Sequence, residues 1–226
     1  MRKQNKTKIK KAVILAGGLN SRMLPISKVI PKVMLPYKDK LTIQYLVEEC
    51  VNAGIEKIYF VVRDDESLIK KYFEPSPQLN FLLQKYGKKE MVDKLNQIEN
   101  YCEVNFVKQP EPLGEADAAY AVRDVINGDP FAILLGDTMY MSEEPAIKQL
   151  MIKTEACNRK LRMGDSRFIF SKSTYRLFCD RYKKEDDKLD QRIEDMFDDE
   201  EICFATFSGK KIRVGELDKY RKLFVE

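Results

Sequence analysis

One segment near the start of the chain is more informative about the fold than any other, and it reads Lys11-Ala-Val-Ile-Leu-Ala-Gly-Gly-Leu-Asn-Ser-Arg-Met-Leu-Pro-Ile-Ser-Lys-Val-Ile-Pro-Lys-Val-Met-Leu-Pro36. It opens on a short apolar run, residues 12–16, which predicts a buried strand. Gly17 and Gly18 follow, and glycines at a strand end let backbone N–H groups approach a phosphate because no Cβ stands in the way. Cations that can neutralise phosphate come next, at Arg22, Lys28 and Lys32. The segment therefore predicts a site for a nucleoside triphosphate.

The glycine pair matches neither of two common phosphate-binding motifs. No Gly-Lys-Ser/Thr follows it, which excludes a P-loop, and the third glycine of the dinucleotide-binding fingerprint is absent. A glycine pair alone is often only a turn, so the prediction rests on the whole segment.

The composition is typical of a soluble globular protein, but its charge is unevenly distributed. The chain has 226 residues and a formal net charge of +4, yet residues 1–11 hold six Lys/Arg and no acid, which leaves 34 basic and 36 acidic residues in the rest. The body is therefore not a basic nucleic-acid binder, and residues 1–10 are expected to form a solvated basic leader. No apolar run approaches the length of a membrane span. We expect neither nucleic acid nor a membrane as a partner.

The absence of histidine limits the available chemistry. It excludes Ser-His-Asp and Cys-His nucleophiles and histidine metal sites. Carboxylates, cations, backbone groups and an oxygen-bound metal remain, and these are the groups that phosphoryl and nucleotidyl transfer use. The cysteines are odd in number and widely spaced, without Cys-x-x-Cys, so we expect them to be reduced, mostly buried and in a cytoplasm. They are Cys50, Cys102, Cys157, Cys179 and Cys203.

The periodicity of apolar residues predicts an α/β fold. Buried strands are expected at residues 12–16, 57–62, 103–107 and 131–135, separated by helices at 41–51, 67–73, 79–100 and 116–126. Such alternation favours right-handed crossovers and a mainly parallel, mixed central sheet with helices on both faces. Beyond residue 143 we expect helices at 145–158 and 174–182, a strand at 167–170, a solvated helix at 184–201, a hairpin of 202–207 with 211–214, and a short helix near 216. With no repeats or low-complexity linkers, residues 11–226 are interpreted as one domain.

Two further motifs follow predicted strands. Gln109-Pro-Glu-Pro-Leu-Gly114 comes after the third strand, and a glutamine amide offers the donor and the acceptor that match the carbonyl and imide N–H of uracil. Gly136-Asp137 ends the fourth strand, where ligands bind in α/β sheets, and its carboxylate suits a hard ion such as Mg²⁺. The alternatives are a proline-rich loop at the first motif and an aspartate capping a turn at the second.

Together these motifs resemble those of the sugar nucleotidyltransferases, whose signature is Gly-Gly-x-x-x-Arg followed by Pro-Lys. The repeated Met-Leu-Pro is similar to that of the UDP-glucose pyrophosphorylase (UTP–glucose-1-phosphate uridylyltransferase) branch. The resemblance implies a single Rossmann-like nucleotidyltransferase domain that binds UTP or a UDP-sugar, a sugar 1-phosphate and Mg²⁺. Roles are implied for eight residues: nucleotide binding for Ala16, Gly17, Gly18, Gln109 and Gly114, catalysis for Arg22 and Lys32, and metal binding for Asp137.

The resemblance is uneven along the chain. Residues 11–142 match the nucleotide-binding half of the family, whereas 143–226 look like a shortened, truncated sugar-binding half. The family's Glu-Lys-Pro motif does not occur, Arg213 stands where the family has a second metal-binding aspartate, and Val33 replaces the glutamate after Pro-Lys.

Three functions therefore stay open at this point. The first is a short uridylyltransferase that forms UDP-glucose and pyrophosphate from UTP and glucose 1-phosphate, with impaired catalysis. The second is an inactive nucleotide-binding paralogue that regulates or scaffolds a full-length relative. The third is a nucleotidyltransferase with another phosphorylated acceptor, such as phosphocholine. Assembly into a homo-oligomer is also left open, and Gln109 does not separate uridine from thymidine.

Overall fold

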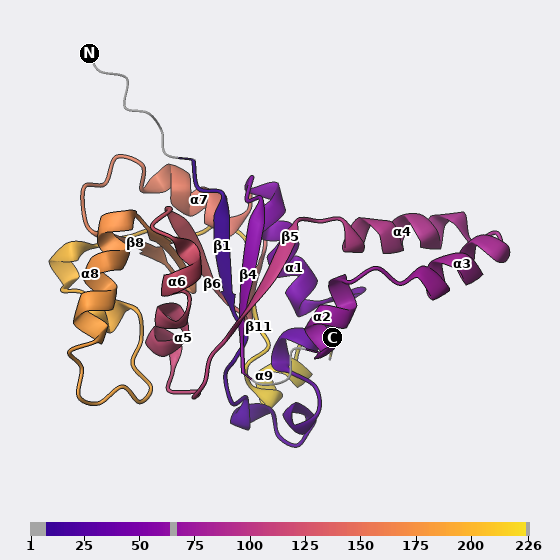
Figure 1. Ribbon diagram of the computed structural model, residues 1–226, viewed down its shortest axis with the longest axis horizontal. Helices are drawn as coiled ribbons and strands as arrows, with labels where there is room; N and C mark the ends of the chain where they lie inside the picture. Colours follow the sequence, from indigo (N-terminus) through magenta and orange to yellow (C-terminus); the bar gives the residue numbers. More distant parts are fainter. Residues whose placement is uncertain (1–7, 64–66, 225–226) are drawn as a thin grey trace, which may run out of the picture.

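A seven-stranded sheet forms the centre of the protein (Figure 1), in a computed structural model that describes residues 8–63 and 67–224. The strand order is β10-β8-β9-β6-β1-β4-β5, with β1, β4, β5 and β6 parallel to one another and β9 antiparallel to both of its neighbours. The prediction of a mainly parallel, mixed sheet is thereby confirmed. The strands are β1 Lys11–Leu15, β4 Lys57–Val62, β5 Glu103–Lys108, β6 Phe131–Leu135, β8 Leu161–Gly164, β9 Arg167–Phe170 and β10 Ile202–Phe204.

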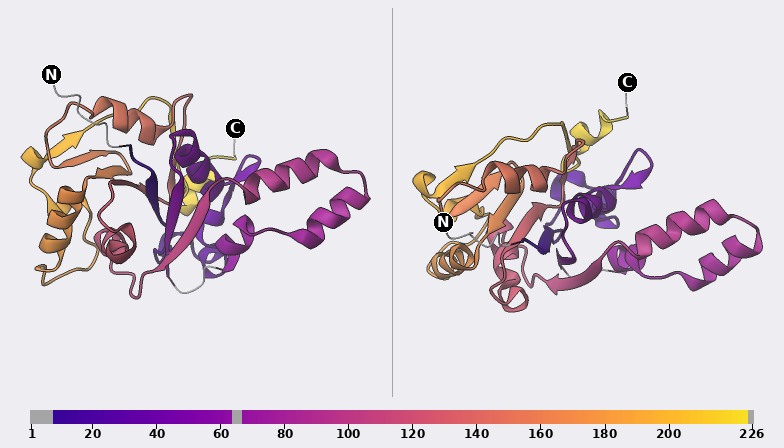
Figure 2. Two further views of the ribbon diagram at one scale, coloured as in Figure 1. Left: turned by 45° about the horizontal axis from the view of Figure 1, so that its top comes forward. Right: turned by 90° about the horizontal axis from the view of Figure 1, so that it is seen from above.

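Helices cover both faces of this sheet, because its central strands are apolar on both sides. Along β1, Ala12 and Ile14 belong to one buried cluster and Val13 and Leu15 to another. The first cluster is completed by α1 Thr42–Asn52, α2 Ser67–Phe73 and α7 Ala146–Lys153. The second is completed by α5 Glu115–Ala121, α6 Arg123–Ile126 and α8 Lys172–Tyr182 (Figure 2). In the described part of the chain no helix is long and apolar enough to cross a bilayer.

Two small sheets flank the central one. β2 Pro36–Tyr37 pairs with β3 Lys40–Leu41, and β7 Thr138–Met141 pairs antiparallel with β11 Lys210–Arg213. The second pair joins residues about seventy positions apart and leads into the last helix, α9 Leu217–Arg221.

A fully buried ion pair ties the two halves of the chain together. The Arg167 guanidinium donates to both carboxylate oxygens of Glu49 on α1, at 2.7 and 2.6 Å, and it also donates to the Thr138 carbonyl. The Arg167 side chain has no exposed surface. Glu49 further accepts the Ile147 N–H at the start of α7. The pair therefore fixes α1, β7, β9 and α7 relative to one another.

The expected helix at 79–100 is wrong, because this segment is a helical hairpin. It consists of α3 Pro77–Lys85 and α4 Lys89–Glu99, which project together from the body of the molecule (Figures 1 and 2). Gly87 between them has a φ of +67°, a left-handed conformation that glycine adopts at little cost and that ends a helix. Helical periodicity resumes directly after this turn, so the pattern along the sequence looks continuous.

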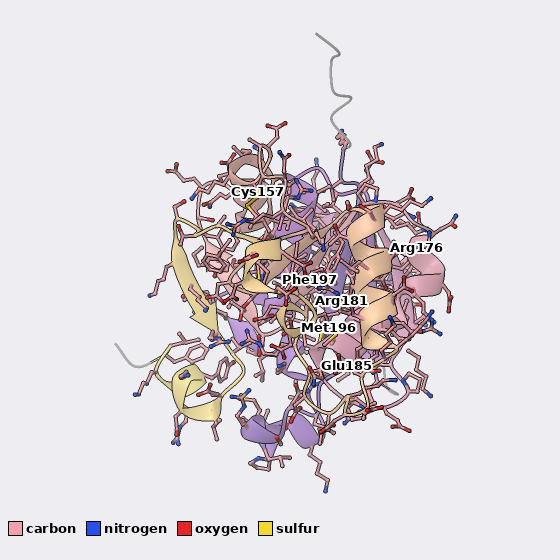
Figure 3. The ribbon with its side chains drawn as sticks, turned by 90° about the vertical axis from the view of Figure 1, so that its left-hand side faces the viewer. Cys157, Arg176, Arg181, Glu185, Met196 and Phe197 are labelled. Atoms are coloured by element: carbon pink, nitrogen blue, oxygen red, sulfur yellow. A yellow bond between two sulfur atoms is a disulfide. The ribbon has the colours of Figure 1, made fainter. Side chains whose placement is uncertain are left out.

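The expected solvated helix at 184–201 is also wrong. The chain there is irregular, with two short 3₁₀ turns, Glu194–Met196 and Asp199–Glu201. Its apolar residues Met196 and Phe197 are buried, and Arg181 of α8 donates to the Met196 carbonyl at 2.7 Å (Figure 3). These apolar residues are spaced as on one face of a helix, but they are buried because they anchor a loop to α8. This loop packs against the segment that leads into α5, where the Asp190 N–H donates to the Leu113 carbonyl at 2.6 Å and the loop reaches the site described below.

The expected hairpin of 202–207 with 211–214 does not form. β10 pairs in parallel with β8, while β11 pairs with β7 in the separate small sheet. The alternating pattern identified strands correctly but not their partners, since pairing over long sequence separations leaves no local signal.

The prediction that the cysteines are reduced is corrected for one pair. Cys157 and Cys203 form a disulfide, because the pairing of β10 with β8 brings Cys203 to the turn that follows α7. Cys50, Cys102 and Cys179 are free, and only Cys50 is fully buried. Most of the predicted basic leader, residues 1–7, lies outside the described residues.

Candidate nucleotide-binding site

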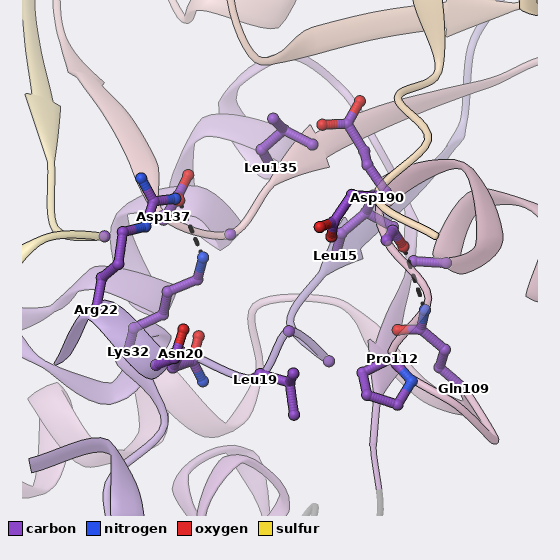
Figure 4. A pocket seen from close by; sticks show the side chains of 18 residues that line it. Leu15, Leu19, Asn20, Arg22, Lys32, Gln109, Pro112, Leu135, Asp137 and Asp190 are labelled. Atoms are coloured by element: carbon purple, nitrogen blue, oxygen red, sulfur yellow. Dashed lines mark hydrogen bonds and ion pairs between the residues drawn. The ribbon is translucent and has the colours of Figure 1, made fainter. Parts of the chain in front are cut away.

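A cavity of about 430 Å³ opens beyond the carboxyl ends of β1, β5 and β6 (Figure 4). Seven of the eight residues singled out from the sequence line it, although they come from positions more than a hundred residues apart: Gly17, Gly18, Arg22, Lys32, Gln109, Gly114 and Asp137. Parallel strands deliver their carboxyl ends to one edge, which explains why distant motifs meet.

Gly17 is required by the closeness of its neighbours. A Cβ at this position would lie 2.8 Å from Gln109 Oε1 and 3.3 Å from the backbone of Val62, so any side chain would displace the glutamine. Ala16 does not line the cavity. Its side chain is buried and its N–H donates to the Val61 carbonyl at 2.8 Å, so it holds the turn against β4.

The cations of the first segment lie in very different surroundings. Arg22 follows the glycines in a 3₁₀ turn, is 71% exposed, and its guanidinium lies 3.3 Å from a Glu216 carboxylate oxygen. Lys32 is only 19% exposed and faces Asp137. Lys28 is exposed and is not among the cavity-lining residues. The structure thus brings two of the three cations to the cavity.

Lys32 and Asp137 form an ion pair at the wall of the cavity. Lys32 Nζ donates to Asp137 Oδ2 at 2.9 Å, and the Thr138 hydroxyl donates to Oδ1 at 3.0 Å. Burial alone would raise the pKa of Asp137, but the charge and hydrogen bond of Lys32 outweigh it, with help from Thr138 and Arg213, and the pKa lies below its ordinary value. Asp137 is therefore an anion at neutral pH.

The C-terminal part of the chain shapes the surroundings of Asp137. The Val214 N–H donates to the Asp137 carbonyl at 2.9 Å, and a Cβ on Gly215 would lie 2.7 Å from Asp137 Oδ2. Arg213 is exposed on β11, next to Thr138 in register. A glycine at position 215 is what allows the carboxylate to reach the cavity.

The donor set around Asp137 suits a hard ion that takes most of its ligands from a nucleotide. Within residues 8–63 and 67–224, no group of three or more His, Cys, Asp or Glu side chains is arranged to hold a metal. Mg²⁺ needs fewer protein ligands, because it commonly binds through one or two carboxylates, phosphate oxygens and water. Lys32 donates to one carboxylate oxygen of Asp137 and Thr138 to the other, and each oxygen keeps a lone pair that could bind such an ion.

Gln109 is almost fully buried at the opposite end of the cavity, with 2% of its surface exposed. Its Nε2 donates to Asp117 Oδ2 at 2.9 Å and to the Gly114 carbonyl at 3.2 Å, and its Oε1 lies against Gly17. Gly114 has a φ of +133°, and a Cβ there would lie 3.0 Å from the Asp190 backbone. Both residues are therefore fixed before a ligand binds.

Sequence reasoning missed two acidic residues that line the cavity, Glu115 and Asp190. Glu115 is the first residue of α5 and accepts the Ile193 N–H at 3.3 Å. Burial, followed by the neighbouring Glu194, raises its pKa to about 7. Asp190 was hidden by the incorrect helix at 184–201, whereas Glu115 directly follows the Gln109 motif and could have been noticed.

Comparison of the sequence with models of known protein families identifies the family to which the chain belongs. The family model described as nucleotidyl transferase matches residues 11–165, more than half of the chain, so the chain belongs to the nucleotidyl transferase family.

Among its members the chain is similar to uridylyltransferases that act on glucose 1-phosphate. It is 42% identical over 148 residues to UTP–glucose-1-phosphate uridylyltransferase of Bacillus subtilis, covering 66% of this chain and 51% of that protein. It is 44% identical over 144 residues to UTP–glucose-1-phosphate uridylyltransferase 2 of Staphylococcus saprophyticus, covering 64% and 50%. The chain thus spans about half the length of these curated relatives.

Solved structures show that the fold is shared over a longer stretch. A UTP-bound UGPase from Acinetobacter baumannii superposes with a TM-score of 0.82 at 22% identity, covering 95% of this chain and 92% of that one. A UDP-glucose pyrophosphorylase complexed with UDP-glucose gives a TM-score of 0.77, also at 22% identity, covering 95% and 97%. At this level of identity the likeness concerns the fold.

Proposed function

We propose that the cavity binds UTP or a UDP-sugar and that the chain transfers a uridylyl group between UTP and a sugar 1-phosphate, with glucose 1-phosphate as the first candidate. The observation that carries the proposal is the convergence of Gly17, Gln109, Lys32 and Asp137 on one cavity. Gln109, which would bind the base, lies at one end, and the pair of Lys32 and Asp137 lies at the other. A nucleotide likewise has its base at one end and its charged phosphates at the other.

The proposed reaction is a substitution at phosphorus. An oxygen of the acceptor phosphate attacks the α-phosphorus of UTP, a new P–O bond forms, and the bond to the leaving pyrophosphate breaks. Such transfers depend on positioning and on neutralising charge. Lys32, partly buried, is suited to stabilise the α-phosphate, and exposed Arg22 is suited to hold the β- and γ-phosphates once Glu216 releases it.

We propose Mg²⁺ as the metal and Asp137 as its protein ligand. Bound there, the ion would screen phosphate charge and orient the oxygens. Lys32, displaced from Asp137 Oδ2, would turn its ammonium group toward a phosphate oxygen. Metal and nucleotide are therefore expected to bind cooperatively.

A second candidate is a nucleotide-binding paralogue with little or no turnover that acts on a full-length relative. One observation favours it: Arg213 places a cation beside Asp137. At ~4 Å and an effective dielectric near 20 two unit charges interact by about 4 kcal/mol, and an exposed arginine that can turn to solvent interacts by less. A loss of ~3 kcal/mol lowers a rate by about a hundredfold. A different phosphorylated acceptor is a third candidate.

Turnover assays with the purified chain separate these candidates. UTP, Mg²⁺ and a panel of sugar 1-phosphates and phosphocholine are supplied, and pyrophosphate release is measured with UTP binding followed in parallel by calorimetry. We expect UTP binding with weak glucose-1-phosphate uridylyltransfer. Binding without turnover on any acceptor would favour the paralogue. No binding of any uridine nucleotide at millimolar concentration would overturn the proposal.

Location and assembly stay predictions. We propose a cytoplasmic location, a compartment in which the disulfide between Cys157 and Cys203 would be exposed to reduction, and the assay is therefore run with and without reductant. Assembly into a homo-oligomer is measured by light scattering.

A further inference from the structure

We propose that Asp117, held by Tyr182, is a specificity-determining positioning residue that fixes the side-chain amide of Gln109 so that only its carbonyl oxygen reads the base. The site would then select bases that present an N–H, such as uracil or thymine, and reject cytosine. This inference rests on the proposed nucleotide site and adds to it the residues that set base choice.

The first step of the argument is the orientation of the Gln109 amide. Its Nε2 group has two hydrogens, and both have acceptors: Asp117 Oδ2 at 2.9 Å and the Gly114 carbonyl at 3.2 Å. Neither acceptor is able to donate, since one is a carboxylate and the other a backbone carbonyl. Flipping the amide would place the Gln109 oxygen against two other oxygens, so the opposite orientation is strongly disfavoured.

The second step is the anchoring of Asp117 itself. The Tyr182 hydroxyl donates to Asp117 Oδ1 at 2.8 Å, which leaves Oδ2 for Gln109. Tyr182 is 1% exposed, and its ring packs against Tyr120 and Phe178 at centroid distances of 5.0 and 6.2 Å. Burial, followed by its hydrogen bond to Asp117, raises the pKa of Tyr182, so the hydroxyl keeps its proton and remains a donor. A rigid chain of contacts therefore runs from α8 through α5 to Gln109.

The third step concerns the group of the Gln109 side chain that is still available to hydrogen-bond a base. Gln109 Oε1 lies on the side of Gly17, away from Asp117, and both Gln109 and Gly17 line the cavity (Figure 4). A carbonyl oxygen accepts the imide N–H of uracil or thymine. The corresponding ring nitrogen of cytosine is an acceptor, and two facing acceptors leave a buried polar group unpaired. Sites built to hydrogen-bond a substrate discriminate strongly for this reason.

The test measures the ratio of the affinities for UTP and CTP with Mg²⁺ by calorimetry, for the whole chain and three variants. Asp117→Asn keeps the shape but offers an amide N–H to Gln109, so a flipped Gln109 amide that presents Nε2 to the base is opposed by one oxygen, the Gly114 carbonyl, instead of two. Tyr182→Phe keeps the ring and removes the hydroxyl that holds Asp117. The matched control is Tyr175→Phe, since the Tyr175 hydroxyl is also buried on α8 and donates to α5, at the Ala119 carbonyl (2.7 Å), without touching Asp117.

We expect Asp117→Asn to lower the preference for UTP over CTP by about tenfold, the loss of one hydrogen bond, and Tyr182→Phe to lower it less. Tyr175→Phe should leave the ratio unchanged, although it should cost stability. Thermal unfolding of each variant confirms that it is folded, and if Asp117→Asn does not fold, Tyr182→Phe decides alone. A wild-type preference for UTP that survives in the folded variants would overturn the inference and leave the proposed function standing. A wild-type chain that binds neither nucleotide would overturn the proposed function itself.

Discussion

Lys32 Nζ lies 2.9 Å from Asp137 Oδ2 across the wall of the cavity, joining the end of the first sequence motif to the end of β6. The two side chains are 19% and 17% exposed, so their charges are only partly screened by water. A cation that would contact the nucleotide and a carboxylate that would hold a metal thus neutralise each other before either ligand is present. Binding of the proposed nucleotide would then exchange the partners of these two charges instead of burying new charge.

The first prediction concerns this exchange. Lys32→Ala should weaken binding of UTP by roughly tenfold or more, because a charge-assisted contact to phosphate is lost, while uridine affinity changes little. Calorimetry with both ligands measures the difference. Lys40→Ala is the matched control, since Lys40 is also partly buried and paired at 2.9 Å, with Glu48, outside the cavity. Equal losses for UTP and uridine in Lys32→Ala would argue against a phosphate role.

The second prediction is a pH dependence set by Glu115. Its pKa rises from 4.5 to about 7 in the folded chain, so folding favours the protonated form and this residue reduces stability progressively as pH increases from 4.5 to about 7. Glu115→Gln removes the penalty and can still accept the Ile193 N–H. We expect little difference near pH 4 and a more stable variant above pH 7, by roughly 3 kcal/mol.

Urea unfolding of wild type and Glu115→Gln across this pH range measures the effect. Glu143→Gln, at an exposed position, serves as the control and should behave like wild type throughout. A variant that is no more stable than wild type at pH 8 would contradict the raised pKa.

The third prediction addresses Arg213. Arg213→Asp replaces a cation beside Asp137 by a second carboxylate and should tighten Mg²⁺-dependent UTP binding, because like-charge repulsion with Mg²⁺ is removed. It should not restore a full rate of transfer to glucose 1-phosphate, since the Glu-Lys-Pro motif is missing. The Mg²⁺ concentration that gives half-maximal UTP binding is the measurement. Lys210→Asp is the matched control and makes the same change of charge on β11. Lys210 lies three residues before Arg213, so its side chain lies on the opposite face of the strand.

The fourth prediction concerns the buried pair of Glu49 and Arg167. Arg167→Ala leaves Glu49 buried without its partner and should lower the free energy of unfolding by about 3–5 kcal/mol. Lys57→Ala breaks a partly exposed pair with Glu103 and should cost less than about 1 kcal/mol. Chemical denaturation at neutral pH compares the two variants. Similar losses of the free energy of unfolding in both would show that the buried pair contributes no more to stability than the partly exposed one.

The nucleotide half of the fold could be predicted from the sequence because its signals are local. Apolar runs mark β1, β4 and β6, and each binding motif directly follows a strand, so the parallel arrangement alone brings Gly17 and Asp137 together. The partners of β10 and β11 could not be predicted, because pairing with β8 and β7 depends on contacts distant in sequence. The link from Gln109 through Asp117 to Tyr182 was hidden for the same reason.

The position of Gly215 against Asp137 has a consequence for how the protein is made. Residues 11–137 supply Gln109, the glycine turn and Asp137, but the backbone that packs against the Asp137 carboxylate comes from residues 213–215. In a chain emerging from the ribosome, the central strands β1, β4, β5 and β6 would thus be available before the backbone that packs against Asp137. The proposed nucleotide would be held in this geometry only in chains in which β11 has docked on β7, so its binding would favour that docked state.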